Sequence, residues 1–469
     1  MTIELIGVLM FGIGCFAMFR DSSVIVYTFL CATLLGSAAA FILESLGRTN
    51  ISPAHLLLGF LTLKLLSDPT VSQNSIRELA IDRPAFWLLL TTAYAVLSAY
   101  FMPRLFAGEV FIFPVREALT PSANPLAPAM SNVTQSIYLV ADFVCFFVLS
   151  GYVQGRTGQQ TLVNAAIACA LLNLIFALLD LVTDATKTTE LLAFIRNANY
   201  AVLNDGSIAG LKRIVGSFNE ASSFGAVTLG YFAFTNALWM WGIRPRLTLT
   251  LSLLSVAALV FSTSTTAYVG LSAFLLIRYA GILVRAAHRP LTRQMTLFIV
   301  GVPIVLLILG IAVAMSVEAS AYVSDFLDTT VLNKMATDSG VERSAWNRQA
   351  LEVFFDTYGF GAGNGSLRAS SFPLAVLGSL GIVGTTLFSI FFLRLFLQKE
   401  RARHDPLSAA YRQAAKAACL AWLITMTISG TLTDIGLPFF VFAAIAGSSP
   451  LAVRGPALLS SEPLRAATF

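Results

Sequence analysis

Long apolar runs dominate this chain of 469 residues and leave no room for a soluble domain of any size. Hydrophobic residues make up 57% of the sequence and charged residues 12%. A soluble domain of this composition would have too few polar residues to cover its apolar interior. A helix needs about 20 apolar residues to cross a hydrocarbon core about 30 Å thick. We therefore expect an all-α polytopic membrane protein with 12 to 14 transmembrane helices, the whole chain 1–469 forming one integral membrane domain.

Thirteen apolar runs carry this expectation, and the first, third and last of them are short or interrupted. They lie near residues 4–19, 24–43, 51–66, 84–101, 133–153, 161–183, 221–241, 247–262, 264–284, 295–317, 371–397, 414–430 and 434–448. The first run follows Glu4 with no basic residue before it, which is not the pattern of a cleaved secretory signal. We expect this run to remain as a helix.

Basic residues in short loops predict the orientation of the chain. Residues 285–293 and 399–416 are rich in arginine and lysine, and such loops face the cytoplasm. Alternating from there places the three longest loops, 102–132, 184–220 and 318–370, on the outer face. Because this asymmetry accounts for the net charge of +5, we do not expect nucleic-acid binding.

The last of these loops contains a predicted helix. Ser339 followed by Glu342 forms a capping box, which predicts a helix over residues 340–356. At 100° per residue Arg343 lies on the packed face, whereas Arg348 lies on the opposite face with Glu352. Arg348 is then either an exposed helix charge or a substrate contact. A guanidinium on the packed face is costly without an anionic partner, so Arg343 is the stronger candidate for a site.

Alternating glycines follow this helix at positions 359, 361, 363 and 365. Glycine permits positive φ and lets backbone amides approach an anion, so the run is compatible with a nest for phosphate oxygens. A turn that leads the chain back into the membrane is the alternative.

The middle outer loop ends with Lys212, Arg213 and Glu220, directly before an apolar run. Glu220 is either a first-turn charge that the helix dipole keeps ionised, or a proton acceptor that faces Arg213 and Arg343. Both interpretations remain open from the residues alone.

These residue types suit the displacement of a diphosphate from a lipid-linked saccharide. Guanidinium groups can hold two phosphate oxygens of the leaving group through paired donors, without a metal. A carboxylate can accept the proton of the attacking hydroxyl, with Glu220 as first candidate and Glu342 as second. Trp346 either stacks on a sugar ring or packs in the core.

Three segments in order, RIVGSFNEASSFG, STSTTAYVG and ERSAWNRQALEVFFDTYGFGAGNGSLRASS, resemble the O-antigen polymerase and O-antigen ligase superfamily. The similarity spans roughly residues 210–400 and is closest to polymerases of bacterial exopolysaccharide repeat units. It implies a GT-C-like fold in the bacterial inner membrane, with the three long loops in the periplasm. It also implies inverting transfer without metal or cofactor, undecaprenyl-diphosphate-linked oligosaccharide as substrate, and a flippase and a chain-length regulator as partners.

The resemblance also assigns residues. A functional arginine in each of two large periplasmic loops corresponds here to Arg213 and Arg343. The family pattern of an arginine, ten intervening residues and a glycine fits Arg348 to Gly359, but the position that would be glycine after Arg213 is Phe224. We expect catalytic roles for Arg213, Glu220 and Arg343, and substrate contacts from Lys212, Trp346, Arg348, Gly361, Gly363 and Arg368.

Two other functions remain as alternatives. A ligase that transfers glycan to another acceptor belongs to the same superfamily, but similar ligases use a histidine in the last large loop, and residues 318–370 contain none. A lipid-linked saccharide transporter or flippase would also be a polytopic bundle with internal arginines. Transporters often repeat one half of the fold in the other, and the two halves of this sequence show no such repetition.

Overall fold

The computed structural model describes residues 2–44, 48–115, 122–198, 207–208, 211–318, 320–321, 324–325, 338–398 and 405–448. Its helices are α1 (Leu5–Met18), α2 (Ser22–Thr33), α3 (Pro53–Leu66), α4 (Pro69–Arg77), α5 (Pro84–Leu105), α6 (Met130–Tyr152), α7 (Arg156–Ala185), η2 (Thr189–Ile195), α8 (Ala221–Met240), α9 (Pro245–Phe261), α10 (Thr265–Ala286), α11 (Arg293–Ala314), α13 (Asp338–Asp356), α14 (Phe372–Leu397), α15 (Pro406–Ser429) and α16 (Leu437–Gly447). Short antiparallel strands pair as β1 (Thr2–Ile3), β2 (Phe41–Leu43) and β3 (Thr49–Ile51), as β4 (Phe111–Ile112) with β5 (Asn124–Pro125), and as β6 (Ser207–Ile208) with β7 (Leu211–Lys212).

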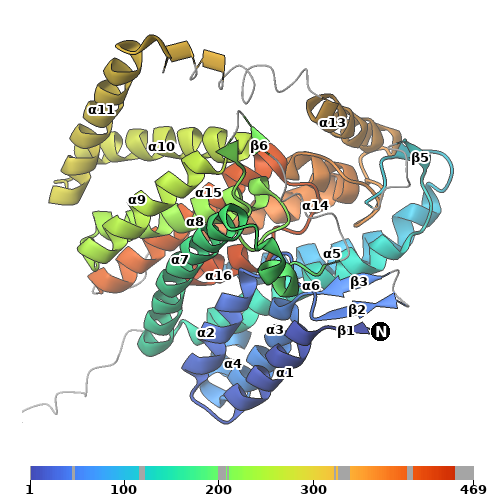
Figure 1. Ribbon diagram of the computed structural model, residues 1–469. Helices are drawn as coiled ribbons and strands as arrows, with labels where there is room; N and C mark the ends of the chain where they lie inside the picture. The colour runs from blue at the N-terminus through green and yellow to red at the C-terminus, as the bar shows by residue number, and fades with distance from the viewer. Residues whose placement is uncertain are drawn as a thin grey trace, which may run out of the picture.

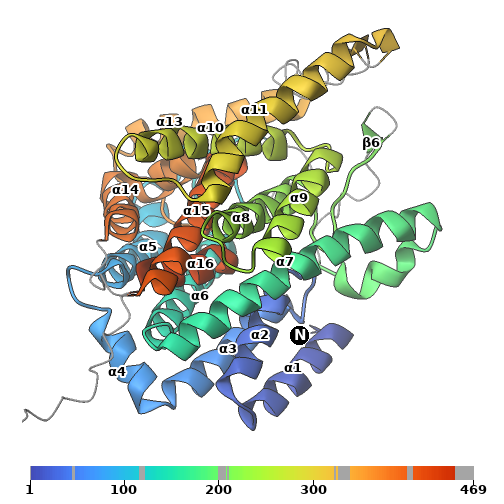
Figure 2. The same cartoon turned by 90° about the vertical axis from the view of Figure 1, so that its left-hand side faces the viewer.

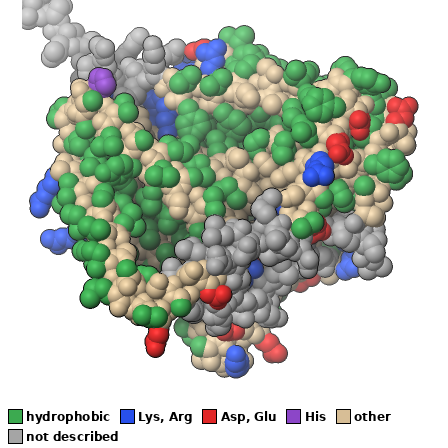
Figure 3. All heavy atoms as spheres, turned by 90° about the horizontal axis from the view of Figure 1, so that it is seen from above, with side chains coloured by type: hydrophobic (Ala, Val, Ile, Leu, Met, Phe, Trp, Pro, Cys, Tyr) green, Lys and Arg blue, Asp and Glu red, His purple; other side chains and the backbone are tan. Residues whose placement is uncertain are grey.

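The fold is a multi-pass bundle of apolar helices, as the sequence predicts. Six of the described helices, α5, α6, α7, α10, α11 and α14, are long and apolar enough to cross a membrane, judged by length and composition. Five more apolar helices, α1, α2, α3, α9 and α16, are shorter than 18 residues. The predicted number of 12 to 14 crossing helices is therefore larger than the six that meet this criterion. Large hydrophobic side chains are exposed on many of the helices, and they cover much of the face seen in Figure 3.

Helix α8 lies at the centre of one half of the bundle. It packs against α7, α9, α10 and α15 (Figures 1 and 2). Nearly all of its side chains are buried. In contrast, α11 lies at the edge of the bundle, where only Met295 and Phe298 are buried. The apolar composition of α8 thus serves contacts with other helices, while that of α11 suits contact with lipid.

The predicted run at residues 24–43 is not one helix. Helix α2 ends at Thr33, and the following segment runs through irregular, buried backbone to strand β2. The side chain of Asn197 pairs with the backbone of Ala39, accepting from its amide at 2.9 Å and donating to its carbonyl at 3.1 Å. The Ser37 amide donates to Ser217 O at 3.0 Å. Polar groups of the middle loop therefore replace the hydrogen bonds that a continuous helix would have made, which permits irregular backbone inside the protein.

Helix α14 is broken at Gly381, whose φ is 61° and ψ is −159°. The glycine-rich segment 359–365 supplies hydrogen-bond partners at this break. The Ala362 amide donates to Gly378 O and the Gly363 amide to Ser379 O, each at 2.8 Å, while the Ile382 amide donates to Gly359 O at 2.9 Å. The break in α14 is thus satisfied by a second segment of chain.

The segments before α6 and around α13 pack together at one end of the bundle (Figure 1). Gln349 Nε2 donates to Phe111 O at 2.6 Å, and the Arg368 amide donates to Phe113 O at 3.0 Å. A separate hydrophobic cluster joins Ile112 and Leu126 to Val353. The described residues of the predicted outer loops 102–132 and 318–370 therefore pack together.

Candidate functional site

A cavity of about 280 Å³ opens where α8 begins and where the chain connects α15 to α16. Glu220 and Ser222 line one wall, and Gly430 and Asp434 line the other. Two acidic side chains from distant parts of the sequence therefore face the same space. None of the sequence-predicted site residues except Glu220 lies in this lining.

Glu220 occupies the N-cap position of α8 with extended backbone, at φ −154° and ψ 159°. Its side chain does not cap the helix amides. Instead, Ser222 Oγ donates a hydrogen bond to Glu220 Oε1. The carboxylate is thus held at the cavity wall, at the positive end of a 20-residue helix.

Arg213 is half-buried just before α8, and its side chain is close enough to Glu220 and Arg343 for their charges to act on it. Burial is the main cause that lowers the pKa of Arg213 from its ordinary value, and the positive charge of Arg343 lowers it further. Glu220 and Tyr268 oppose this shift. Arg213 Nε is buried without a hydrogen-bond partner among the described residues. The guanidinium therefore has donor capacity that no described residue uses.

The helix that carries Arg343, α13, begins two residues earlier than the predicted start at residue 340 and ends at Asp356 as predicted. Arg343 is half-buried and Arg348 is exposed, in agreement with the two helix faces predicted from the sequence. Glu342, the second candidate for the base, is half-buried next to Arg343. The structure thus brings Arg343 toward Arg213 and leaves Arg348 on the outer face of α13.

Lys212 lies apart from the cavity because it contacts the end of α7. Its Nζ atom is 3.3 Å from both Asp180 Oδ1 and Asp184 Oδ1. Asp180 is fully buried and also accepts hydrogen bonds from the Val215 and Gly216 amides at 2.8 and 3.1 Å. These contacts hold the backbone on both sides of Arg213, so Lys212 serves the position of the loop.

Trp346 and Arg368 form a pair of their own. The Arg368 guanidinium carbon lies 3.8 Å from the centre of the Trp346 ring, and Trp346 is only 6% exposed. This arrangement matches the core role that the sequence left open for Trp346. The contact helps to dock α13 on the segment that follows it.

Gly361 and Gly363 have φ values of 81° and 93°, so both use the conformation that favours glycine. Their amides are already engaged, because Gly361 donates to Thr357 Oγ1 and Gly363 donates to Ser379 O, each at 2.8 Å. These contacts favour the turn that the sequence left as the alternative to a phosphate nest.

Asp434 and Asp142 are acidic residues that the sequence reasoning did not select. Asp434 lines the cavity and accepts from the Gly436 amide at 2.7 Å. Asp142, on α6, is 1% exposed and its carboxyl group lies beside that of Asp434, where its Oδ2 atom has no hydrogen-bond partner among the described residues. Two carboxylates in contact repel each other unless a proton lies between them. The sequence did contain a signal for Asp142, which lies inside the predicted span 133–153. Carboxyl groups are rare in membrane helices and usually functional there.

Within the described residues, no group of three or more His, Cys, Asp or Glu side chains is placed to hold a metal ion.

The fold and the apolar helices define the class: a multi-pass helical membrane protein. Neither protein-family models nor curated proteins give a match to this chain.

Proposed function

We propose that this protein is a membrane glycosyltransferase, GT-C-like in fold, that polymerises lipid-linked oligosaccharide repeat units at the bacterial inner membrane. It transfers the growing glycan from undecaprenyl diphosphate to a hydroxyl of the next lipid-linked unit. The observation that supports this proposal is the grouping of Arg213 with Glu220 and Arg343 beside a cavity that also contains Asp434.

The arginines suit the leaving group. As the bond between the anomeric carbon and the diphosphate oxygen breaks, negative charge develops on the diphosphate. The two guanidinium groups of Arg213 and Arg343 repel each other in the protein alone, and an anion between them would remove this repulsion. Arg213 also has the unused buried donor at Nε, which makes preorganised stabilisation of a phosphate oxygen possible.

Glu220 suits the attacking group. The acceptor hydroxyl loses a proton while its oxygen bonds to the anomeric carbon, and a carboxylate within hydrogen-bond reach can accept that proton. Attack on the face opposite the departing diphosphate inverts the anomeric configuration. Arginines neutralise the diphosphate in this scheme, and the reaction takes place on the periplasmic side, where a flippase supplies the substrate.

A reconstituted reaction tests this function. The purified full-length protein in liposomes receives a polyprenyl-diphosphate-linked oligosaccharide in the presence of a chelator, and the products are separated on a gel. We expect a ladder of polymers from the wild-type protein and a strongly reduced ladder from Arg343→Ala. A single addition to a foreign acceptor would indicate a ligase instead. Unchanged saccharide that exchanges between the two leaflets would indicate a transporter, and either result would overturn the polymerase.

A further inference from the structure

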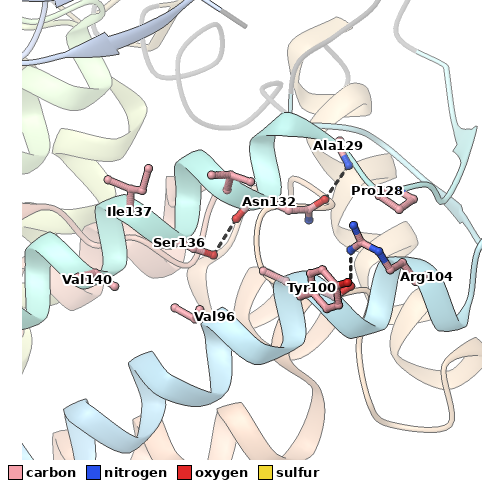
Figure 4. A pocket seen from close by; sticks show the side chains of 11 residues that line it. Val96, Tyr100, Arg104, Pro128, Ala129, Asn132, Ser136, Ile137 and Val140 are labelled. Atoms are coloured by element: carbon pink, nitrogen blue, oxygen red, sulfur yellow. Dashed lines mark hydrogen bonds between the residues drawn. The ribbon is translucent and has the colours of Figure 1, made fainter. Parts of the chain in front are cut away.

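A groove of about 440 Å³ lies between α5 and α6, away from the cavity at Glu220. Val96, Tyr100 and Arg104 form its α5 wall, and Asn132, Val133 and Ile137 contribute to its α6 wall (Figure 4). Its volume is within the range of about 300–1,000 Å³ that is usual for ligand sites. The groove is therefore large enough for part of a lipid chain.

The walls of this groove are apolar and face outward. Tyr100 is 58% exposed, Val133 48% and Ile137 44%. Both α5 and α6 are long and apolar enough to span a membrane, so side chains exposed on their surfaces meet lipid in the membrane. A hydrocarbon chain can enter the groove from the side without crossing a polar layer.

Arg104 is the charged residue in the lining of this groove. Its guanidinium carbon lies 3.9 Å from the centre of the Tyr100 ring, and its Nη1 atom donates to Tyr100 O at 2.5 Å (Figure 4). Within the described part of the chain, no carboxylate is in ion-pair contact with Arg104. The guanidinium therefore retains donors for an anion at the mouth of an apolar groove, which is the combination that binds phosphate headgroups between membrane helices.

The mouth of the groove lies at the same end of the bundle as the candidate site. Arg104 is in the last turn of α5, and the segment between α5 and α6 contacts α13, the helix of Arg343, through Gln349. Asn132 in the groove donates to Asn364 O at 2.8 Å, and Thr433, next to Asp434, donates to Asn364 Oδ1 at 2.5 Å. A chain of hydrogen bonds thus joins the groove to the wall of the cavity.

We propose that the groove between α5 and α6 holds the isoprenoid chain of a polyprenyl diphosphate, with Arg104 binding its diphosphate. The inference rests on the proposed function, since a polymerase of this kind must hold two lipid-linked saccharides at once. The arginines near the cavity bind the lipid diphosphate that departs, and the groove binds the lipid of the acceptor unit. The acceptor glycan then extends from Arg104 toward Glu220.

Photocrosslinking tests the groove without any transfer reaction. The full-length protein in nanodiscs of neutral phosphatidylcholine receives a polyprenyl diphosphate that carries a diazirine in its isoprenoid chain, and mass spectrometry maps the labelled peptides. We expect labelling of residues 96–104 and 130–140, reduced about fivefold to tenfold in Arg104→Gln. Unlabelled polyprenyl diphosphate should compete, and an equal amount of phosphatidylglycerol should not.

Arg20 provides the matched control, because it also stacks on an aromatic ring, that of Phe16 at 4.9 Å, next to an apolar helix. Arg20→Gln should leave the labelling unchanged. Equal competition by phosphatidylglycerol, undiminished labelling in Arg104→Gln, or labelling mainly outside the groove would each overturn the proposal. Labelling of the groove in a protein that forms no polymer would refute the proposed function alone, whereas a ladder without groove labelling would refute only this inference.

Discussion

The backbone of Gly361 packs directly on that of Gly381, at the point where α14 is broken. A Cβ atom on Gly361 would lie 2.7 Å from the amide nitrogen of Gly381 and 2.7 Å from Ser379 O. Both glycines have positive φ, 81° and 61°. The glycine-rich segment and the broken helix therefore fit together only where neither chain carries a side chain.

Replacing Gly361 by Ala should destabilise the protein for two reasons. The Cβ atom would clash with backbone atoms, and the backbone of an alanine in the left-handed region costs roughly 1–2 kcal/mol more than that of a glycine. We expect a lower melting temperature in detergent and a lower yield of folded protein. Gly310→Ala is the control, since a Cβ at this position of α11 meets nothing within 4 Å. Normal stability of Gly361→Ala with lost turnover would instead favour the phosphate nest.

Asp180→Asn should loosen the middle loop. Asp180 Oδ1 lies 2.7 Å from Arg196 Nη2, and the removal of one partner from a buried ion pair typically costs about 3–5 kcal/mol. Limited proteolysis should show faster cleavage between residues 186 and 220, together with a lower melting temperature. Asp184→Asn is the matched control, because the Asp184 side chain is 40% exposed and such pairs contribute about 0–1 kcal/mol. Similar behaviour of the two variants would contradict the anchoring role of Asp180.

Arg213→Ala and Arg343→Ala should each lower polymer formation about 10²-fold to 10³-fold, the usual cost of removing one preorganised donor from a site of developing negative charge. Arg343→Lys should also be impaired, because an ammonium group cannot reproduce the paired donors of a guanidinium. The initial rate of ladder formation, normalised to folded protein, measures this. Arg348→Ala serves as the control on the exposed face of α13, and a loss there as large as in Arg343→Ala would show that the wrong face was assigned to the substrate.

Glu220→Gln should lower the same rate by at least about 10²-fold, since general-base catalysis contributes about 10²-fold to 10⁴-fold. The amide keeps the shape of the side chain, so the melting temperature should change little. Asp434→Asn, in the same cavity, should also reduce turnover if the second carboxylate contacts the acceptor. Glu352→Gln, exposed on α13, is the control for a change of charge alone. Near-normal turnover of Glu220→Gln would remove this residue from the mechanism.

The apolar runs predicted where the helices lie, because each run supplies the length and hydrophobicity that a buried or lipid-facing helix requires. The prediction is wrong at residues 24–43, where α2 ends at Thr33. Residues 24–43 are apolar enough for a longer helix, but Asn197 and Ser217, far away in sequence, offer the backbone other partners. No local pattern contains that information.

For the candidate site as well, residue spacing predicted some features and only the structure showed the others. The helix period placed Arg343 on the packed face of α13 and Arg348 on the exposed face, because side-chain direction in a helix follows from residue spacing alone. The predicted capping box is wrong, since Ser339 lies inside α13, which begins at Asp338. Spacing could not show that Arg343 reaches Arg213, that Lys212 is occupied by Asp180, or that Asp434 shares a cavity with Glu220.

The sequence by itself determined that this protein is a helical membrane protein, because the cost of exposing apolar surface to water is a property of composition and length. The tertiary structure decided which polar groups meet. Helix packing brought Asp142 to Asp434 and the glycine-rich segment to the break in α14, since buried charges and backbone amides are stabilised only by partners that folding delivers from elsewhere in the chain.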